Sequence, residues 1–279
     1  MIAIIPSAGL GTRFLPFTKS VPKELVPIMG VPSIQYIIKE ACSNDITSFC
    51  IVINKQKTAL KQYLTIDNAL NTELKKKNKL FLVEEINNII EKCTIQFIDQ
   101  YAPLGLGHAV LCARELSKYN EPFVCIMLPD ELLFDDQHEP TLLKEMHELA
   151  QQHTASVIAV KEVPLSQTAS YGIIKANSLP NTKNCFLVNQ VIEKPNPLQA
   201  PSRLAIIGRY VLEKDIFDVL PTVSAGSGGE IQLTDGIAAL IDKGKKVIAY
   251  QYAGNRFDVG SPQGWLDANI FINNKQKKS

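Results

Sequence analysis

Short apolar runs that alternate with segments of helical periodicity constrain the fold of this 279-residue chain more than any other feature. The first run is IAII, near the start of the chain, and SFCIVIN, TIQFID and PFVCIML follow it. Between them, SIQYIIKEAC places Ile34, Ile37, Ile38 and Ala41 on one face of a helix. Fully apolar strands separated by helices indicate an α/β protein whose central sheet is mostly parallel and covered on both faces.

The second half of the chain has a looser pattern. Past residue 150, five strand candidates have only two helix candidates between them, near 213–220 and 231–243. The strand candidates are ASVIAVKEV, YGIIKA, FLVNQVIEKP, LAIIGRYVL and KVIAYQY. With so few crossover helices, we expect these strands to extend the first sheet as antiparallel additions.

No Pro/Gly/Ser-rich linker and no internal repeat divides the chain. We therefore predict one domain over residues 1–272, with a boundary between its two halves at about 135. The segment GWLDANIFINN is expected to form a terminal helix, which we place at 261–272, and residues 273–279 are expected to form a basic tail.

Composition excludes several classes of function. The formal net charge of +1 gives no broad basic surface for nucleic acid or anionic membrane. No run approaches the roughly 18 apolar residues of a membrane span. The cysteines stand singly and form no C-x-x-C pair, so we expect a reducing, cytoplasmic location without disulfides or a thiolate metal site. They are Cys42, Cys50, Cys93, Cys112, Cys125 and Cys185.

A glycine-rich loop, PSAGLGTRF, follows the first strand but fits neither common phosphate loop. A dinucleotide-binding G-x-G-x-x-G would need glycine where Phe14 stands, and a P-loop would need lysine where Thr12 follows Gly11. Glycines nevertheless let the backbone approach a ligand closely and turn its amides toward anionic oxygens.

Two cations accompany this loop. Arg13 lies within it, and Lys23 stands between Pro22 and Glu24, where the backbone is stiffened. A guanidinium and an ammonium beside a glycine loop are typical of a polyphosphate site. The alternative is a surface turn with incidental charges.

Four strand ends carry unusual residues, in IIPSAGLGTR, FIDQYAPLGLGHA, CIMLPDE and YAGNRFDVG. Ligands of open α/β sheets collect at the carboxyl ends of strands, so one crevice could contain all four. Asp130 of LPDE suits Mg²⁺, which takes one or two protein carboxylates with phosphate and water oxygens. Asp258 of RFDVG stands at the end of the last strand, before a glycine and a helix. The alternatives are a turn or helix cap at Asp130 and a helix cap at Asp258.

Two further segments carry polar groups that a ligand in this crevice could use. Gln100 precedes a second glycine turn at Gly105, and a side-chain amide offers both a donor and an acceptor. Glu193 and Lys194 of VIEKP could hold sugar hydroxyls and a phosphate, but only if the strand bends there, because neighbouring side chains of a strand face opposite ways. An exposed ion pair is the alternative. His108 is expected to be structural.

In order along the chain, these motifs resemble the signature of the sugar-1-phosphate nucleotidylyltransferases, and more narrowly of the bacterial UTP–glucose-1-phosphate uridylyltransferases. The likeness covers nearly the whole chain and lies in IPSAGLGTRFLPFTKSVPKELVPI, APLGLGHAVLCA, LPDE, YGII, VIEKP, APSRLAIIGRYVL, GGEIQLTD and RFDVG. It implies a Rossmann-like nucleotidyltransferase fold with a nucleotide-binding half at about 1–135 and a smaller antiparallel sugar-binding half at about 136–260.

The resemblance also implies a role for each candidate residue. Arg13, Lys23 and Lys194 would be catalytic cations, and Asp130 and Asp258 would bind Mg²⁺. The family usually has a second aspartate where Glu131 stands, so Glu131 is a departure. Nucleotide contacts would come from Ala8, Gly9, Gly11, Thr12, Glu24, Gln100 and Gly105, and sugar contacts from Gly172, Glu193, Lys194, Gly208 and Glu230.

The implied reaction converts UTP and glucose 1-phosphate into UDP-glucose and pyrophosphate, in a homodimer or homotetramer. Two alternatives stay open. A thymidylyltransferase of the same fold usually has glycine at Ala8 and a shorter segment where LNTELKKKNKLFLVEEINNIIEK stands. A catalytically silent regulator that binds UDP-sugar is disfavoured because all five charged candidates are present together.

Overall fold

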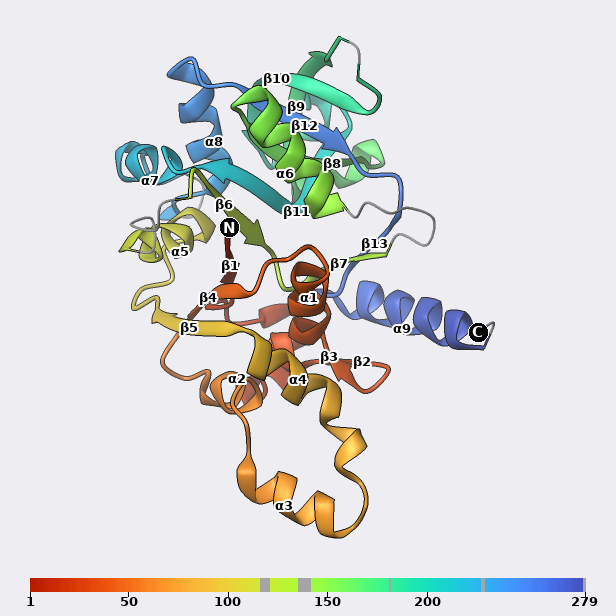
Figure 1. The fold of residues 1–279 in the computed structure, drawn as a ribbon. Helices are drawn as coiled ribbons and strands as arrows, with labels where there is room; N and C mark the ends of the chain where they lie inside the picture. The colour runs from red at the N-terminus through yellow and green to blue at the C-terminus, as the bar shows by residue number, and fades with distance from the viewer. Residues whose placement is uncertain (116–120, 135–141, 181, 227–228, 278–279) are drawn as a thin grey trace.

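The computed structural model of the chain describes residues 1–115, 121–134, 142–180, 182–226 and 229–277. Its centre is a nine-stranded sheet in the order β5-β4-β1-β6-β11-β8-β12-β10-β9 (Figure 1). The strands in chain order are β1 (Ile2–Pro6), β4 (Ser48–Ile53), β5 (Thr94–Asp99), β6 (Phe123–Met127), β8 (Ser156–Glu162), β9 (Gly172–Ser178), β10 (Cys185–Glu193), β11 (Leu204–Glu213) and β12 (Val247–Gln251).

The first half of the sheet is parallel, as the apolar runs predict. β1 pairs in parallel with both β4 and β6, and β4 pairs in parallel with β5. Alternate residues of β1 enter different cores, with Ile4 on one face and Ile5 on the other. Burial on both faces explains why these strands consist almost entirely of apolar residues.

All five strands predicted past residue 150 are present. β11 runs antiparallel to β6 and β8, and β10 runs antiparallel to β12 and β9. One pairing differs from the antiparallel expectation, because β12 is parallel to β8. The helix before β12 returns the chain to the edge where β8 also begins, with Val247 opposite Ser156.

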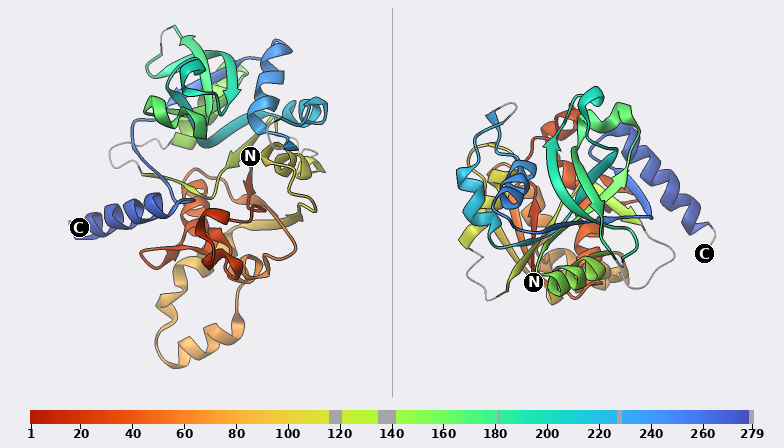
Figure 2. Two further views of the ribbon diagram at one scale, coloured as in Figure 1. Left: turned by 180° about the vertical axis from the view of Figure 1, so that it is seen from behind. Right: turned by 90° about the horizontal axis from the view of Figure 1, so that it is seen from above.

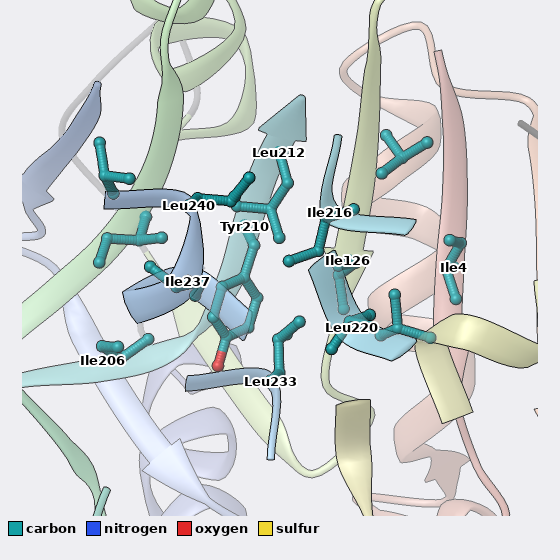
Figure 3. Packing of buried hydrophobic residues seen from close by; sticks show 14 of the residues in the cluster. Ile4, Ile126, Ile206, Tyr210, Leu212, Ile216, Leu220, Leu233, Ile237 and Leu240 are labelled. Atoms are coloured by element: carbon teal, nitrogen blue, oxygen red, sulfur yellow. The ribbon is translucent and has the colours of Figure 1, made fainter. Parts of the chain in front are cut away.

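Helices cover both faces of the sheet. They are α1 (Ser33–Cys42), α2 (Thr58–Tyr63), α3 (Asn68–Lys76), α4 (Glu84–Lys92), α5 (Leu106–Cys112), α6 (Leu142–His153), α7 (Ile216–Val219), α8 (Leu233–Asp242) and α9 (Pro262–Gln276). On one face, Ile4 and Tyr210 of the sheet share a core with residues of α5, α7 and α8. Ile237 of α8 is one of these residues (Figure 3). On the other face, Ile5 and Ile51 share a core with residues of α1, α2, α4, α6 and α9.

Two helical segments extend away from the sheet (Figures 1 and 2). One is the stretch that carries α3, and the other is α9.

The prediction ended the last helix at 272, but α9 continues to Gln276, so most of the expected basic tail is helical. Ser261 caps its start by accepting a hydrogen bond from the Gly264 amide. Neither proline nor glycine follows Ile272 to stop the helix.

A small two-stranded ribbon completes the part of the fold that matters for the site. β7 (Glu131–Phe134) pairs antiparallel with β13 (Asn255–Asp258), with Glu131 opposite Asp258. A second short pair joins β2 (Pro27–Ile28) to β3 (Val31–Pro32). No helix in the described part of the chain has the length and apolar character needed to cross a membrane.

Candidate active site

Two adjoining cavities open at the carboxyl ends of β1, β5 and β6. The first, of about 290 Å³, is lined by Ala8, Gly9, Lys23, Gln100, Gly105 and Asp130, among others. The second, of about 390 Å³, is lined by Arg13, Asp130, Gly172, Glu193, Lys194 and Asp258, among others. Asp130 and Glu230 border both cavities. The structure therefore brings all four unusual strand ends to one crevice.

The glycine loop folds onto the lysine that follows it. Gly11 has φ +67°, and a Cβ added there would lie 3.1 Å from the Lys23 Cβ and 3.1 Å from the Thr18 Cγ2. The Thr18 hydroxyl donates to the Gly11 carbonyl at 2.8 Å. The chain then makes a 3₁₀ turn over Thr12–Phe14, which leaves Thr12 and Arg13 exposed at the mouth of the crevice. Glycine at 11 thus permits both the backbone conformation and the close contact.

The predicted phosphate-binding cations pair with the predicted metal ligands. Lys23 Nζ lies 2.5 Å from Asp130 Oδ2, and Arg13 Nη1 lies 3.1 Å from Asp258 Oδ2. Burial lowers the pKa of Lys23, but Asp130 and Glu24 outweigh it, so this pKa is raised. Burial likewise raises the pKa of Asp130, but Lys23 outweighs it, so this pKa is lowered. Both side chains of the Lys23 pair are therefore charged at neutral pH.

Asp130 and Asp258 converge at Gly260. A Cβ on Gly260 would lie 2.8 Å from Asp130 Oδ2 and 3.0 Å from Asp258 Oδ1, so glycine leaves the space between the carboxylates free of a side chain. Two carboxylates around such a space fit a divalent cation that takes its other ligands from phosphate and water oxygens. Within the described residues, no group of three His, Cys, Asp or Glu side chains could hold a metal by itself.

Glu24 lies behind the crevice in a buried ion pair. Its carboxylate accepts from Lys57 Nζ at 2.7 and 2.9 Å, and its residue is 1% exposed. Burial raises the pKa of Glu24 and lowers the pKa of Lys57, and each partner opposes that shift in the other. The expected nucleotide contact through Glu24 stays a prediction, and in this structure its carboxylate is directed to Lys57.

Gln100 is held at the smaller cavity by internal hydrogen bonds. Its Nε2 lies 3.1 Å from the Gly105 carbonyl and 2.9 Å from His108 Nδ1. Gly105 has φ +97°, and a Cβ there would lie 2.7 Å from the Ile231 carbonyl oxygen. These contacts fix the orientation of the Gln100 amide and give His108 a structural part, as the sequence predicts.

The strand that carries VIEKP bends where the sequence requires it. β10 ends at Glu193, and Lys194 has φ +45°, outside the extended region. This bend puts Lys194 Nζ 3.3 Å from Glu193 Oε1, and both residues line the larger cavity. The other Glu193 oxygen accepts from the Thr234 hydroxyl at 2.7 Å.

The two glycines predicted for the sugar differ in their surroundings. Gly172 lines the larger cavity, where a Cβ would lie 3.2 Å from Glu193 Oε2. Gly208 has φ +73° in an irregular part of β11, and its Cβ side is filled by Leu128 and Glu131 at 2.9–3.0 Å. Packing within the chain therefore already accounts for glycine at 208. A sugar contact there stays a prediction.

Comparison with known proteins identifies the family. The Nucleotidyl transferase family matches residues 2–275. The chain belongs to the nucleotidyl transferase family. It is 39% identical over 268 residues to the UTP–glucose-1-phosphate uridylyltransferase of Pseudomonas aeruginosa, covering 96% of this chain and 94% of that one.

Solved structures of UDP-glucose pyrophosphorylase share the fold of this nucleotidyl transferase. One, complexed with UDP-glucose, is 37% identical with a TM-score of 0.88, and the match covers 98% of each chain. A UTP-bound enzyme from Acinetobacter baumannii is 36% identical with a TM-score of 0.86, covering 97% of this chain and 92% of that one. The resemblance and the fold class inferred from the sequence motifs are confirmed. Members of this family generally use a divalent metal.

The sequence did not single out three side chains that this nucleotidyl transferase builds into the site. Lys57 neutralises Glu24, Thr234 holds Glu193, and Arg256 binds Glu131 through Nε at 2.7 Å and Nη2 at 2.5 Å. Arg256 lies within RFDVG and Thr234 within GGEIQLTD, so their places in these motifs could have marked them as site residues. Lys57 had none, because INKQK is indistinguishable from a solvated surface segment.

Proposed function

We propose that the chain transfers the uridylyl group of UTP to α-D-glucose 1-phosphate, giving UDP-glucose and pyrophosphate. Relatives named for this activity align along nearly the whole chain. The observation that carries the proposal is a single crevice, formed by two adjoining cavities, whose walls carry the two proposed metal ligands and the three proposed phosphate-binding cations. A nucleoside triphosphate and a sugar phosphate together need such an arrangement.

In this proposal, UTP occupies the cavity beside the glycine loop. The backbone of Ala8, Gly9, Gly11 and Thr12 faces its base and phosphates, and Gln100 with Gly105 pairs with the uracil edge. Glucose 1-phosphate occupies the larger cavity, where Glu193, Gly172 and Glu230 border the sugar and Lys194 its phosphate. Ala8, Gly9, Gln100 and Gly105 line the smaller cavity, and Gly172, Glu193, Lys194 and Glu230 line the larger one. Gly11 and Thr12 line neither cavity and are assigned by the family resemblance alone.

The reaction is a direct displacement. A phosphate oxygen of glucose 1-phosphate attacks the α-phosphorus of UTP, and the bond from that phosphorus to the oxygen of the leaving pyrophosphate breaks. Lys194 holds the attacking phosphate, Lys23 the α-phosphate and Arg13 the pyrophosphate. Because the attacking oxygen is already ionised, the chain needs no nucleophilic side chain, and its work is positioning and charge neutralisation.

Asp130 and Asp258 would hold the divalent cation, Mg²⁺ in this proposal. When bound, the cation supplies further neutralisation of phosphate charge and helps to align the two substrates. Since Lys23 and Arg13 pair with these carboxylates, we expect the phosphates to draw both cations away as the substrates bind.

The setting of the enzyme is also proposed. We infer a cytoplasmic homodimer or homotetramer with small-molecule substrates and without nucleic acid or membrane partners. The two projecting segments carry exposed apolar residues that we assign to subunit contacts, namely Phe81 and Leu82 after α3 and Leu266 and Ile270 on α9.

The experiment measures pyrophosphate release with Mg²⁺ and glucose 1-phosphate, for UTP, dTTP, ATP, CTP and GTP side by side. The proposal expects a strong preference for UTP. A preference for dTTP would instead identify a thymidylyltransferase. If no nucleotide turns over while UDP-glucose raises the melting temperature, the chain is a UDP-sugar-binding regulator.

A further inference from the structure

Arg256 belongs to the RFDVG motif, yet the proposed reaction gives it no role. Its guanidinium binds the Glu131 carboxylate with two hydrogen bonds, and both side chains are 9% exposed. Residues two apart in a strand share a face, and Glu131 is opposite Asp258 in the ribbon. Arg256, Glu131 and Asp258 therefore lie on one face of the β7–β13 ribbon.

This arrangement separates two negative charges from each other. Like charges directly opposite in an antiparallel pair are destabilising. Arg256 neutralises Glu131 and directs it along the ribbon, so that Asp258 stays available at the crevice. Glutamate is longer than aspartate by one methylene, and its carboxylate reaches Arg256 from this position.

Arg256 also contacts the sugar side of the crevice. Its Cζ lies 4.6 Å from the centre of the Tyr171 ring, a cation–π contact. The Tyr171 carbonyl accepts the backbone amide of Lys194 at 3.0 Å. This hydrogen bond holds the bend at which Lys194 takes its positive φ.

We propose that Arg256 is a positioning residue for the sugar phosphate. Through Tyr171 it fixes the bend that presents Lys194, and through Glu131 it ties this bend to the ribbon that carries Asp258. The role rests on the proposed function, because the sugar phosphate is a substrate of that reaction.

The first test compares Arg256→Met, Arg256→Lys and a control, Arg203→Met, which removes an exposed arginine paired with Glu162. Arg256→Met should raise the KM for glucose 1-phosphate by about tenfold or more, since small displacements of a binding group have large kinetic effects. The KM for UTP should rise less than the KM for glucose 1-phosphate, because Arg256 reaches the proposed metal ligand Asp258 only through Glu131. Arg256→Lys should recover part of the loss, and the control should behave as wild type.

A double-mutant cycle tests whether Arg256 acts through Tyr171. Tyr171→Leu removes the ring but leaves the ion pair, and it should raise the same KM, whereas Tyr171→Phe keeps the ring and should raise it less. If the two residues act together, Arg256→Met with Tyr171→Leu is little worse than the worse single variant. Tyr171→Leu also tests the proposal if Arg256→Met does not fold.

Three results would overturn the inference. The first is an unchanged KM for glucose 1-phosphate in both Arg256→Met and Tyr171→Leu. The second is a rise in the KM for UTP of Arg256→Met that equals the rise in its KM for glucose 1-phosphate. The third is a KM for glucose 1-phosphate in the double variant that rises by the product of the two single-variant factors. Failure of the wild-type protein to turn over UTP with glucose 1-phosphate would overturn the proposed function itself.

Discussion

Lys23 Nζ lies 2.5 Å from Asp130 Oδ2, so the lysine expected to bind phosphate is paired with the carboxylate expected to bind metal. Arg13 and Asp258 repeat this relationship at 3.1 Å. These two cations and two carboxylates thus neutralise one another before any substrate arrives. Binding a nucleotide together with a cation exchanges these internal pairs for pairs with phosphate and metal.

Replacing Lys23 by methionine should lower kcat/KM by about 100-fold or more, because the proposed phosphate partner in the crevice is lost. Steady-state pyrophosphate release measures this. Lys19→Met is the matched control, since Lys19 is an exposed lysine in the same loop and borders neither of the two cavities. Equal activity of the two variants would contradict the role of Lys23.

Gly260→Ala should weaken binding of the divalent cation and lower activity, because the new Cβ would lie 2.8 Å from Asp130 Oδ2 and 3.0 Å from Asp258 Oδ1. Electron paramagnetic resonance of Mn²⁺, with and without UTP, measures the binding directly. The control is Gly244→Ala, where a Cβ meets no atom within 4 Å and the positive φ costs about 1–2 kcal/mol of stability. Normal Mn²⁺ affinity in Gly260→Ala would exclude this metal site.

Gln100→Leu should reduce kcat/KM for UTP and narrow the preference for UTP over CTP, because the amide that we propose to pair with the uracil edge is gone. A site built to hydrogen-bond its substrate discriminates by leaving the wrong partner unpaired. His108→Leu should act in the same direction but less, since His108 only holds the amide. Competition between UTP and CTP measures both. An unchanged preference for UTP over CTP in Gln100→Leu would mean that Gln100 does not contact the uracil base.

Lys57→Met should destabilise the fold by about 3–5 kcal/mol, because it leaves Glu24 buried without its partner. The double variant Glu24→Leu, Lys57→Met should recover much of this loss. Chemical denaturation measures both, with exposed Lys55→Met as the control.

This loss should also depend on pH. Burial raises the pKa of Glu24 above its ordinary value, so the folded state takes up a proton more readily than the unfolded chain. The penalty in Lys57→Met is therefore greatest above the folded pKa of Glu24 and shrinks as the pH falls below this pKa toward the ordinary pKa of a glutamate. A loss of stability that is the same at pH 7.5 and pH 5 would contradict this explanation.

The strands and the crevice could be predicted because they depend on local pattern. Strands buried on both faces must be apolar, so IAII and PFVCIML are recognisable, and the polar groups that follow them meet where parallel strands end. The bend at Lys194 could likewise be predicted, because two neighbouring side chains of a strand can serve one ligand only if the strand bends between them.

The long-range pairs could not be predicted, because nothing local distinguishes their members. Glu131 and Arg256 stand 125 residues apart, and Glu24 and Lys57 stand 33 apart. The two residues of each pair come together only once the sheet and the ribbon have formed. The conformation of Gly208 could not be predicted for the same reason. Its positive φ and its contacts with Leu128 and Glu131 arise from the irregular pairing of β11.

The most direct test of the central claim is a ³¹P NMR spectrum of the protein with UTP, glucose 1-phosphate and MgCl₂. We predict that UDP-glucose and pyrophosphate appear in equal amounts, and that neither appears with Asp130→Asn combined with Asp258→Asn. Persistence of both substrates with the wild-type protein, or release of phosphate from UTP without formation of UDP-glucose, would contradict the account.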